Sequence, residues 1–533
     1  MSTIRFQLQD IPDGGMTSFH QDEQIILVTR DGDQVTAMQG KCPHAGADLG
    51  EGLRCDNRII CPWHHATFDA QSGELLEPLA MNGLERYEIE EDAANPDNKI
   101  IHFDKPIKFK DPDSQQQDSH TLIVGGGGAG FMAATHLRAQ GYAGKITMIS
   151  ADDHAPYNRP LLSKMYLAGN IDEDKLLLGG GSWAEKNSVD LQINTKANEI
   201  NPETKQVTLD NGEQLSADYL IVATGAAPQR PPIDGVDLEG VYVMHSFSDA
   251  KAIAEAVDNK NVVIIGTGFI GMEAAASLTQ RGTTASITVI GMSDSVMDNI
   301  ISPQVGAGLQ QLHESNGVVF QMGAAVSEIT SQAGKVSGVT LKSGKTIDAD
   351  VVIMGTGVKP RVEVIETAKK DPKDGVNVSA NLLLEQGAYA LGDIANAQSV
   401  LGKLRIEHWR VALQHGMIAA ENILKQGNDA IEVRPFDERV PFFWTQQFGK
   451  SLRYIGHAET TEHAILRGNP NELNYVEFYF NDDSDNAKVV AASGLAHDKD
   501  IIAIGELIRL GHSPSRAQIR DGLDVVQHLQ DIA

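Results

Sequence analysis

The chain has 533 residues, enough for roughly three or four domains. It carries 44 basic and 72 acidic residues, a net charge of −28, which disfavours nucleic acid and anionic membranes as partners. No apolar run approaches the ~18 residues of a membrane span, and the N-terminus lacks a signal segment. Three cysteines are too few for a disulfide framework. These features predict a cytoplasmic globular enzyme without a membrane span.

Residues 1–107 contain short alternating runs, such as IILVTR and YEIEED, separated by the turn-forming segments DGD and QSGE. Alternation of apolar and polar residues with period two is typical of half-buried strands. We therefore predict a small all-β domain. Residues 108–119 are polar and nearly free of large apolar side chains, which predicts a linker.

Two loops of this domain each contain one cysteine and one histidine, Cys42 with His44 and Cys61 with His64. Zinc fingers usually place their two cysteines together and their two histidines together. The interleaved order instead suits a [2Fe–2S] cluster with both thiolates on one iron and both imidazoles on the other. This pattern resembles the Rieske ferredoxin domain. A Cys2His2 zinc site is the alternative.

Two neighbouring residues are expected to have other roles. Cys55 has no histidine at ligand spacing and is expected to be a buried or loop thiol, whereas His65 directly follows a ligand and is expected beside the cluster or on the surface. Rieske proteins of respiratory complexes add a disulfide between the loops, but Ala47 and Trp63 stand at the corresponding positions. The resemblance is therefore to the ferredoxin type, with a potential toward the low end of the roughly −150 to +300 mV range.

After residue 119 the sequence changes to apolar strands, glycine turns and alanine-rich helices, an α/β pattern. The segments TLIVGGGGAGFMAATHL and VVIIGTGFIGMEAAASL repeat one strand–turn–helix unit. In a G-x-G-x-x-G turn the glycines permit a tight turn, close approach of a pyrophosphate, and close packing of helix on strand. The two sets are Gly125, Gly127 and Gly130, and Gly266, Gly268 and Gly271. Two such units predict two dinucleotide-binding lobes.

Two short motifs link these lobes to a known class. Ala223-Thr224-Gly225 and Gly392-Asp393 each follow an apolar strand, and the sequence resembles the two-dinucleotide-fold flavoprotein reductases, in which such segments close over FAD. The resemblance implies that Asp393 holds a ribityl hydroxyl; capping the following helix is its alternative role. It also divides the rest of the chain into an FAD-binding domain at 120–240 and 346–434, an NAD(H)-binding domain at 241–345 and an α+β C-terminal domain at 435–533.

The segment PYNRPLLSKMYL narrows the family. It resembles the RPxLSK segment of oxygenase-coupled ferredoxin reductases and apoptosis-inducing-factor-like proteins. The resemblance implies that Arg159 meets the FAD pyrophosphate and that Lys164 lies near flavin N5, where a cation stabilises the anionic reduced flavin. Glu273 is the expected partner of Lys164; a favourable acid in the first turn of a helix is the alternative. No cysteine follows Cys61, which excludes dithiol chemistry.

The positions that select the nucleotides depart from the usual pattern. By the resemblance, Asp152 is the candidate to bind the adenosine ribose of FAD. At the equivalent place in the second lobe Gly291 replaces the usual acid, but no basic residue follows to meet a 2′-phosphate, so NADH is favoured over NADPH. Trp409 and Trp444 are candidates to stack near the isoalloxazine or to line the exit path, and ordinary core packing is their alternative role.

Together these features resemble a fusion of a Rieske ferredoxin domain with its FAD-dependent reductase. We predict an oxidoreductase that passes electrons from NADH through FAD to a [2Fe–2S] cluster and on to an unidentified acceptor, an oxygenase or another redox protein. The alternative is a redox-sensing protein in which NADH binding controls conformation or assembly. The sequence predicts neither the terminal acceptor nor the oligomeric state.

Overall fold

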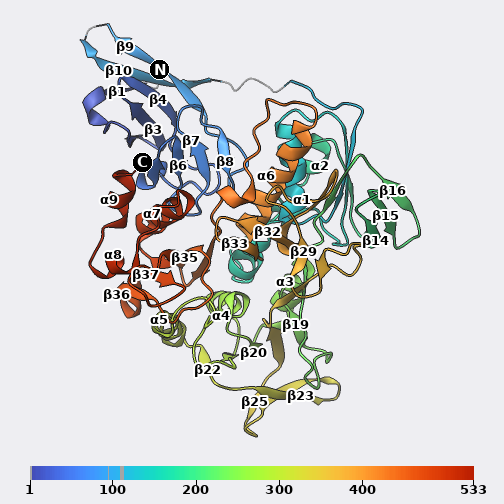
Figure 1. Ribbon diagram of the computed structural model, residues 1–533. Helices are drawn as coiled ribbons and strands as arrows, with labels where there is room; N and C mark the ends of the chain where they lie inside the picture. The colour runs from blue at the N-terminus through green and yellow to red at the C-terminus, as the bar shows by residue number, and fades with distance from the viewer. Residues whose placement is uncertain (1–2, 94, 108–112, 533) are drawn as a thin grey trace.

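The computed structural model describes residues 3–93, 95–107 and 113–532. In Figure 1 the N-terminal domain (blue) lies beside the C-terminal domain (red), and the two nucleotide-binding lobes (cyan to orange) occupy the rest of the molecule. This architecture confirms the predicted multidomain fold class. Within the described ranges, no helix is long and apolar enough to cross a membrane.

The N-terminal domain consists of two antiparallel sheets, as its alternating sequence predicts. The larger sheet has the order β1-β10-β9-β4-β3-β2 and the smaller sheet β5-β6-β7-β8. The strands are β1 (Thr3–Gln7), β2 (Met16–Gln21), β3 (Gln24–Asp31), β4 (Gln34–Gln39), β5 (Leu53–Cys55), β6 (Arg58–Ile60), β7 (Thr67–Asp69), β8 (Leu75–Glu77), β9 (Arg86–Asp92) and β10 (Asn95–Ile107). The two cysteine–histidine loops follow β4 and β6.

The connection to the next domain is partly anchored. Residues 108–112 of the predicted linker lie outside the described residues. Gln116 donates from Nε2 to the carbonyl oxygens of Ile423 at 2.7 Å and Leu424 at 3.2 Å. These are carbonyls of the last turn of α6 (Trp409–Lys425), which also accept from the backbone N–H of the C-cap residue Gln426. The chain is thus fixed to the following lobe before the predicted linker ends at residue 119.

The first nucleotide-binding lobe is built on a six-stranded sheet in the order β13-β12-β11-β17-β31-β30. All neighbouring strands are parallel except β30 and β31. Because helices cover both faces of a parallel sheet, its strands are continuous apolar runs. The elements are β11 (His120–Val124), α1 (Gly128–Ala139), β12 (Lys145–Ile149), α2 (Trp183–Lys186), β13 (Val189–Gln192), β17 (Tyr219–Val222), β30 (Leu383–Glu385) and β31 (Ala388–Ala390).

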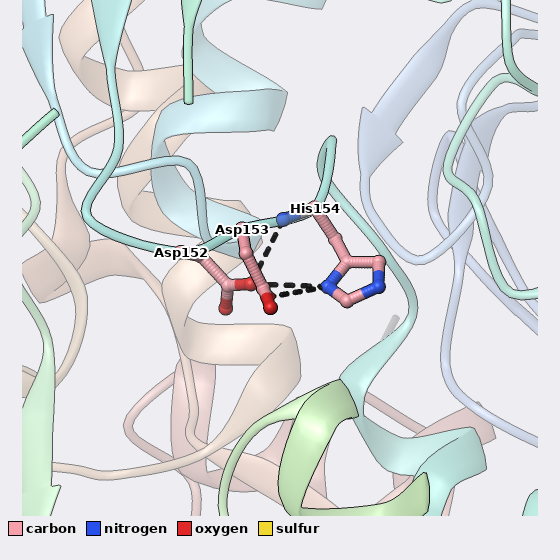
Figure 2. A group of neighbouring side chains, drawn as sticks. All are labelled: Asp152, Asp153 and His154. Carbon is pink, nitrogen blue, oxygen red and sulfur yellow. Dashed lines mark hydrogen bonds and ion pairs between the residues drawn. The ribbon is translucent and has the colours of Figure 1, made fainter. Parts of the chain in front are cut away.

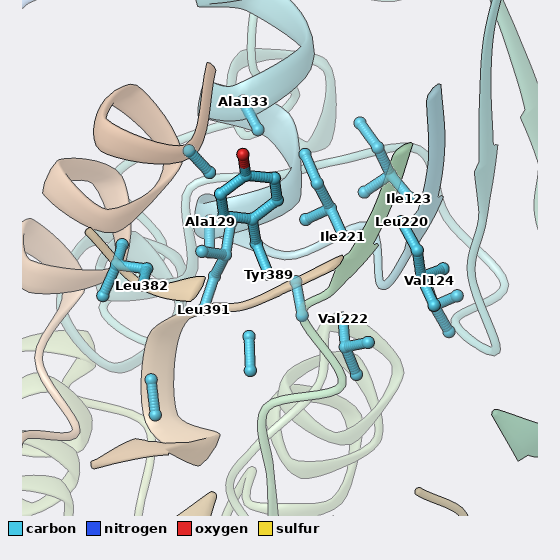
Figure 3. Close-up of a cluster of buried hydrophobic side chains, with 14 of the residues drawn as sticks. Ile123, Val124, Ala129, Ala133, Leu220, Ile221, Val222, Leu382, Tyr389 and Leu391 are labelled. Atoms are coloured by element: carbon cyan, nitrogen blue, oxygen red, sulfur yellow. The ribbon is translucent and has the colours of Figure 1, made fainter. Parts of the chain in front are cut away.

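The core of this lobe holds α1 against the sheet (Figure 3). The small residues Ala129 and Ala133 of α1 leave room for the ring of Tyr389, which projects from β31 next to Ile221. This packing places the first turn of α1 at the carboxyl end of β11. Smaller sheets complete the lobe: β14 (Ala197–Asn201), β15 (Gln206–Leu209) and β16 (Gln214–Ser216); β18 (Ala226–Pro228) with β27 (Val358–Pro360); and β28 (Lys370–Asp371), β29 (Gly375–Asn377), β32 (Ala395–Ser399) and β33 (Gly402–Arg405).

The second nucleotide-binding lobe repeats the plan with a five-stranded parallel sheet, β19-β26-β20-β21-β22. Its strand β26 comes after the domain boundary predicted at residue 345. The boundary is therefore wrong, because the chain returns from a three-stranded hairpin unit to fill the middle of the sheet. The elements are β19 (Val241–Val243), α3 (Phe247–Ala256), β20 (Asn261–Ile265), α4 (Phe269–Arg281), β21 (Ser286–Ile290), α5 (Pro303–Ser315), β22 (Val319–Gln321), β23 (Val326–Gln332), β24 (Lys335–Leu341), β25 (Thr346–Asp348) and β26 (Val351–Met354).

The C-terminal domain is an antiparallel sheet, β34-β35-β38-β37-β36, packed against helix α7. Its first strand also contacts α4 and α6, so it lies between the two nucleotide-binding lobes. This position brings β34 to the predicted flavin site. The elements are β34 (Phe442–Gln447), β35 (Lys450–Gly456), β36 (Ile465–Asn469), β37 (Asn474–Phe480), β38 (Val489–Leu495), α7 (Asp498–Arg509), α8 (Arg516–Arg520) and α9 (Val525–Gln530).

Candidate functional site

The two cysteine–histidine loops meet, and like residues face each other. The thiol of Cys61 hydrogen-bonds to that of Cys42 and thereby lowers the pKa of Cys42. The rings of His44 and His64 lie 4.7 Å apart, edge to face. The structure thus gathers all four residues that the sequence singles out, sorted into one pair of sulfur donors and one pair of nitrogen donors.

These donors suit a cluster with two metal positions. The Nδ1 atoms of His44 and His64 are buried and have no hydrogen-bond partner. Burial lowers the pKa of His44 to about 4, so its imidazole is neutral and available as a ligand. Among the described residues, no three of these four offer ligand atoms within 4.8 Å of one another. A single tetrahedral zinc needs its ligand atoms about 3.3–3.8 Å apart. The arrangement therefore favours a [2Fe–2S] centre over zinc.

The two neighbouring residues are both buried. Cys55 lies in β5, and burial raises the pKa of its thiol to about 12, so it is an inert core thiol. His65 is only 4% exposed, so it is not a surface residue. Its ring stacks on Phe442 of β34, with centroids 3.9 Å apart. The residue that follows the last ligand therefore packs the N-terminal domain onto the C-terminal domain.

The cluster loops also touch the flavin side of the molecule. The ring of His64 packs edge-on against Trp444 of β34, with centroids 4.6 Å apart. Burial, followed by the charges of His44, Arg453 and Lys164, lowers the pKa of His64 to about 3. Arg453 also donates from Nε to the carbonyl oxygen of Trp63 at 3.0 Å. A predicted cluster ligand and the predicted flavin-site lysine therefore lie within electrostatic reach of each other.

A buried charge network, which the sequence does not reveal, holds the domains together. Glu77 of β8 pairs with Arg58 of the same domain and with Arg410 of α6, each at 2.7 Å. Arg58 continues to Glu506 of α7 at 3.2 Å. Gln414 of α6 donates to Glu77 at 2.6 Å. The network therefore joins the N-terminal domain, the first lobe and the C-terminal domain, and we name it the three-domain charge network.

The centre of the charge network is buried. Glu77 and Arg410 are each 4% exposed. Arg410 also donates to the carbonyl oxygens of His65 at 2.9 Å and Pro78 at 3.1 Å. Buried ion pairs are favourable only when their remaining hydrogen-bonding groups are satisfied, and these bonds engage Nε and Nη2 of Arg410. Arg410 of the first lobe thus contacts both the loop beside the cluster and the end of β8.

Both glycine motifs form open phosphate cradles. Gly125 has φ +122°, and a Cβ there would lie 2.1 Å from the carbonyl oxygen of Ala223. Gly127 is the N-cap of α1, and a Cβ on it would meet no atom within 4 Å. The second lobe repeats this, with Gly266 at φ +115° and Gly268 open at the start of α4. A bare helix N-terminus behind open space suits a pyrophosphate.

The third glycine of each motif packs the helix against the turn. A Cβ on Gly130 would lie 2.1 Å from the carbonyl oxygen of Gly125, and one on Gly271 would lie 2.0 Å from that of Gly266. Any side chain there would push the helix off the strand. These contacts agree with the role that the sequence predicts for the third glycine.

The FAD lobe gathers charged side chains around its cradle. Arg159 lies near His245, donating to its carbonyl oxygen. Thr224 donates to the carbonyl oxygen of Arg361 at 2.9 Å, and the backbone of Arg361 donates to Gly225 at 2.9 Å. Burial and the charge of Arg159 lower the pKa of Arg361, so the two guanidinium groups lie within electrostatic reach of each other. The sequence missed Arg361. Two adjacent guanidinium groups suit the pyrophosphate of FAD.

Asp393 lies in the same lobe, after β31. Burial, and next the charge of Glu407, raise the pKa of Asp393 to about 6, above its ordinary value of 3.8. The folded protein therefore binds this proton more tightly than the unfolded chain does. Ionisation of Asp393 consequently destabilises the fold as the pH rises from about 4 to 6.

Replacement of Asp393 by asparagine is expected to remove this pH-dependent loss. The stability of Asp393→Asn relative to the parent should rise by about 1–3 kcal/mol between pH 4 and pH 7. Denaturant unfolding of both flavin-free proteins across this range measures the difference. A stability difference between the two proteins that does not change with pH would contradict the raised pKa of Asp393.

Lys164 and Glu273 form the predicted pair. Lys164 lies in a π-helical turn, Leu162–Tyr166, and its Nζ is 2.8 Å from Oε1 of Glu273. Glu273 is 3% exposed and lies in the second turn of α4, so the first-turn alternative is wrong. Ser163 donates to its Oε2 at 2.5 Å and Thr445 to its Oε1 at 2.8 Å. Residues of both lobes and of β34 therefore contribute to this pair and its hydrogen bonds.

Asp152 follows β12, where the adenosine ribose of FAD is predicted. Figure 2 shows its carboxylate beside Asp153 and His154, and Tyr157 donates to it at 2.7 Å. Nδ1 of His154 lies 2.5 Å from Asp153 and 3.7 Å from Asp152. Their ligand atoms lie within 4.8 Å of one another, but they are taken up by these internal contacts. Asp152 stays where the prediction places it, at the carboxyl end of the sheet.

The two predicted tryptophans lie at one interface. Trp409, the first residue of α6, lies over Gly128 of α1, where a Cβ would meet its ring at 2.7 Å. Trp409 and Trp444 both pack against the apolar cluster that Leu79 of the N-terminal domain shares with α1 and α6. Both side chains are half-buried at this contact between the N-terminal domain and the first lobe.

Two open glycine cradles, a lysine–glutamate pair from both lobes and four gathered cysteine and histidine donors are the features expected of a flavin-dependent reductase carrying an iron–sulfur domain. The chain belongs to the pyridine nucleotide-disulphide oxidoreductase family, whose model matches residues 119–416. A Rieske [2Fe-2S] domain matches residues 4–88, and a reductase C-terminal domain matches residues 442–529. These matches confirm the predicted family and class of enzyme.

Relatives share most of the chain. Apoptosis-inducing factor 3 of Homo sapiens is 28% identical over 527 residues, which cover 96% of this chain and 84% of that protein. The ferredoxin–NAD(+) reductase component of the anthranilate 1,2-dioxygenase system of Burkholderia cepacia is 31% identical over 408 residues, covering 75% of this chain and 96% of that protein. The structure of the covalent putidaredoxin reductase–putidaredoxin complex matches with a TM-score of 0.71 and 26% identity, over 78% of this chain and 99% of that one. The chain is thus a ferredoxin-reductase-type NAD(P)H oxidoreductase with a Rieske domain.

Proposed function

We propose that the chain oxidises NADH at its flavin site and delivers the electrons to an external acceptor through its own Rieske domain. When bound, FAD accepts hydride from the nicotinamide, and the [2Fe–2S] centre takes up and releases single electrons. The contact between His64 and Trp444 carries the proposal. It joins a residue proposed to bind the cluster to one proposed to line the flavin site, within a single chain.

The docking contacts support the proposal, because they keep donor and acceptor sites together. The three-domain charge network and the stacking of His65 on Phe442 fix the cluster loops against the reductase. Covalent connection alone raises the effective concentration of two sites. Fixed docking also holds the cluster loops and the flavin site in one relative orientation. The N-terminal domain therefore needs no diffusional encounter with the flavin lobe.

Each group would be held by residues described above. Cys42, His44, Cys61 and His64 would bind the cluster. FAD would lie in the first cradle, bounded by the arginine pair and Asp393, with the Lys164 ammonium supplying positive charge. The nicotinamide nucleotide would lie in the second. The residues proposed for FAD are Gly125, Gly127, Gly130, Asp152, Arg159, Lys164, Ala223, Thr224, Gly225, Asp393 and Trp444; those proposed for NADH are Gly266, Gly268 and Gly271. Glu273 is proposed as the catalytic partner of Lys164 at the cofactor site.

The end of β21 supports NADH over NADPH. A 2′-phosphate is usually met by a basic side chain here, but this loop continues from Gly291 with Met292, which is 82% exposed. A Cβ at Gly291 would lie 2.7 Å from the side chain of Thr267, so the position favours glycine. The exposed carboxylate of Asp294 would repel a 2′-phosphate. We therefore propose NADH as the electron donor.

An acceptor can reach the cluster loops from solvent. Pro43 and Trp63, next to the ligands Cys42 and His64, are exposed. The Burkholderia relative is named for a dioxygenase system. An oxygenase or another redox protein is therefore the proposed acceptor for this chain.

Anaerobic addition of NADH to the holoprotein is expected to produce a Rieske-type EPR signal with a low average g value. The signal should appear with NADH alone, because the electrons pass within one chain. Freeze-quenched samples would follow its rise, and absorbance would follow bleaching of the flavin. Protein that contains zinc, or whose cluster stays oxidised while FAD is reduced, would refute the proposal; a long-lived reduced flavin would then favour redox sensing.

Two variants sharpen this experiment. Cys61→Ser should abolish the signal while the flavin still bleaches. Trp444→Leu should slow the rise of the signal without slowing flavin reduction, because it removes the ring that contacts His64. Equal slowing of both steps in Trp444→Leu would show that this residue acts on hydride transfer instead.

A further inference from the structure

A chain of buried hydrogen bonds runs from the second lobe to the lysine–glutamate pair. Nε2 of His313, in α5, lies 2.8 Å from Oε1 of Gln447. Nε2 of Gln447 donates to Oγ1 of Thr445 at 3.2 Å, and Thr445 donates to Oε1 of Glu273 at 2.8 Å. Lys164 closes the chain at 2.8 Å. His313 is thus linked to Lys164 through three intermediate side chains.

The direction of each bond follows from the chemistry of the groups. Thr445 donates its single hydroxyl proton to Oε1 of Glu273, because a carboxylate oxygen accepts hydrogen bonds. Oγ1 of Thr445 must then accept from the amide NH2 of Gln447, which turns the amide oxygen toward His313. His313 must therefore donate from a protonated Nε2. Its Nδ1 has no hydrogen-bond partner, so a proton on Nδ1 would be a buried donor without an acceptor.

The chain is sealed from water, so each bond depends on the others. His313 is 0% exposed, and Gln447, Thr445 and Glu273 are each at most 3% exposed. Burial lowers the pKa of His313 to about 4, which keeps it neutral. An unmade bond at a buried polar group costs about 1–3 kcal/mol. A change at His313 is therefore expected to be transmitted along the chain rather than relieved by solvent.

We propose that His313 is a positioning residue for the flavin site: its Nε2–H orients Gln447 and Thr445, which hold the Glu273 carboxylate in place opposite Lys164. This proposal rests on the proposed function in one respect, that the Lys164 ammonium lies beside the flavin. Loss of the donor at His313 frees the Gln447 amide to turn, so Thr445 no longer has a fixed partner. The Lys164 ammonium is then held less firmly.

The midpoint potential of FAD in the holoprotein tests this. In His313→Leu, which removes the N–H donor, the equilibrium constant for two-electron reduction of FAD should fall by about three- to tenfold; tenfold corresponds to about 30 mV. His313→Gln keeps an N–H donor and should stay within about twofold of the parent. An unchanged potential in His313→Leu, or equal shifts in both variants, would overturn the proposal.

A double-mutant cycle separates positioning from a general packing defect. Thr445→Val removes the hydroxyl between His313 and Glu273 and keeps the shape of the side chain. If the residues act in series, His313→Leu should not shift the potential further in the Thr445→Val background. Additive shifts in the double variant would overturn the proposal.

The protonation of the His313 ring can also be measured directly in holoprotein that retains its FAD. In holoprotein labelled with ¹⁵N-histidine, the His313 ring, assigned by its absence in His313→Gln, should be neutral and protonated at Nε2. A proton on Nδ1, or on both nitrogens, at neutral pH would overturn the bond directions. Neither the potential nor the tautomer depends on the cluster or an acceptor, so failure of the electron relay is distinguished from failure of this proposal.

Discussion

Glu77→Gln is expected to undock the N-terminal domain and slow reduction of its cluster at least tenfold. The substitution leaves the guanidinium groups of Arg58 and Arg410 without the buried carboxylate that joins them. Breaking a buried ion pair from one side typically costs about 3–5 kcal/mol. Each ~1.4 kcal/mol lost from docking lowers its equilibrium constant tenfold. The undocked domain would then reach the flavin lobe only by diffusion on its tether.

Stopped-flow reduction by NADH measures this effect, with the flavin and cluster signals followed separately. Flavin reduction in Glu77→Gln should keep the parental rate, since the network does not touch the lysine–glutamate pair. Glu74→Gln is the matched control, because Glu74 lies on the same segment but is exposed. Cluster reduction at the parental rate in Glu77→Gln, with cofactors retained, would show that docking does not limit the transfer.

Lys164→Met is expected to slow reduction of the flavin by NADH about 100-fold. Removal of one preorganised charge at a developing anion typically costs about 10²–10³ in rate. The Lys164 ammonium is fixed for this role, since it lies 2.8 Å from a carboxylate that Ser163 and Thr445 also hold. The side chain of Lys164 is 11% exposed, so its charge is little screened by solvent.

Anaerobic stopped-flow bleaching at saturating NADH measures the rate, and flavin absorbance measures the FAD that the variant retains. Lys175→Met is the control, because the Lys175 side chain is 70% exposed and its ion pair is with the neighbouring Asp172. A rate within about twofold of the parent, at full FAD content, would remove Lys164 from the catalytic site.

The cofactor classes could be predicted from the sequence because their signals are local. A cysteine and a histidine within one loop, and three glycines within one turn, act over a few residues of continuous chain. Such spacing sets which donors or backbone amides can face a ligand whatever the rest of the fold does. The structure places the four cluster residues in two loops and both glycine motifs at helix starts, as these patterns require.

The pairing of Lys164 with Glu273 was predicted only through a family resemblance. The two residues come from different lobes, and nothing in either segment specifies the other. Their contact depends on how α4 packs against the turn that carries Lys164. The third contributor, Thr445 of β34, could not be predicted, since a threonine in an apolar strand carries no signal of its own.

The sequence by itself determined the kinds of site this protein has, and only the tertiary structure decided how those sites are joined. Glu77, Arg58, Arg410 and Glu506 each look like ordinary surface charges in their own segments, and His313 like an ordinary helical histidine. They become a docking network and a positioning chain because burial removes water and leaves one set of partners for each polar group. That pairing depends on contacts between domains, and the spacing of residues along the chain does not record it.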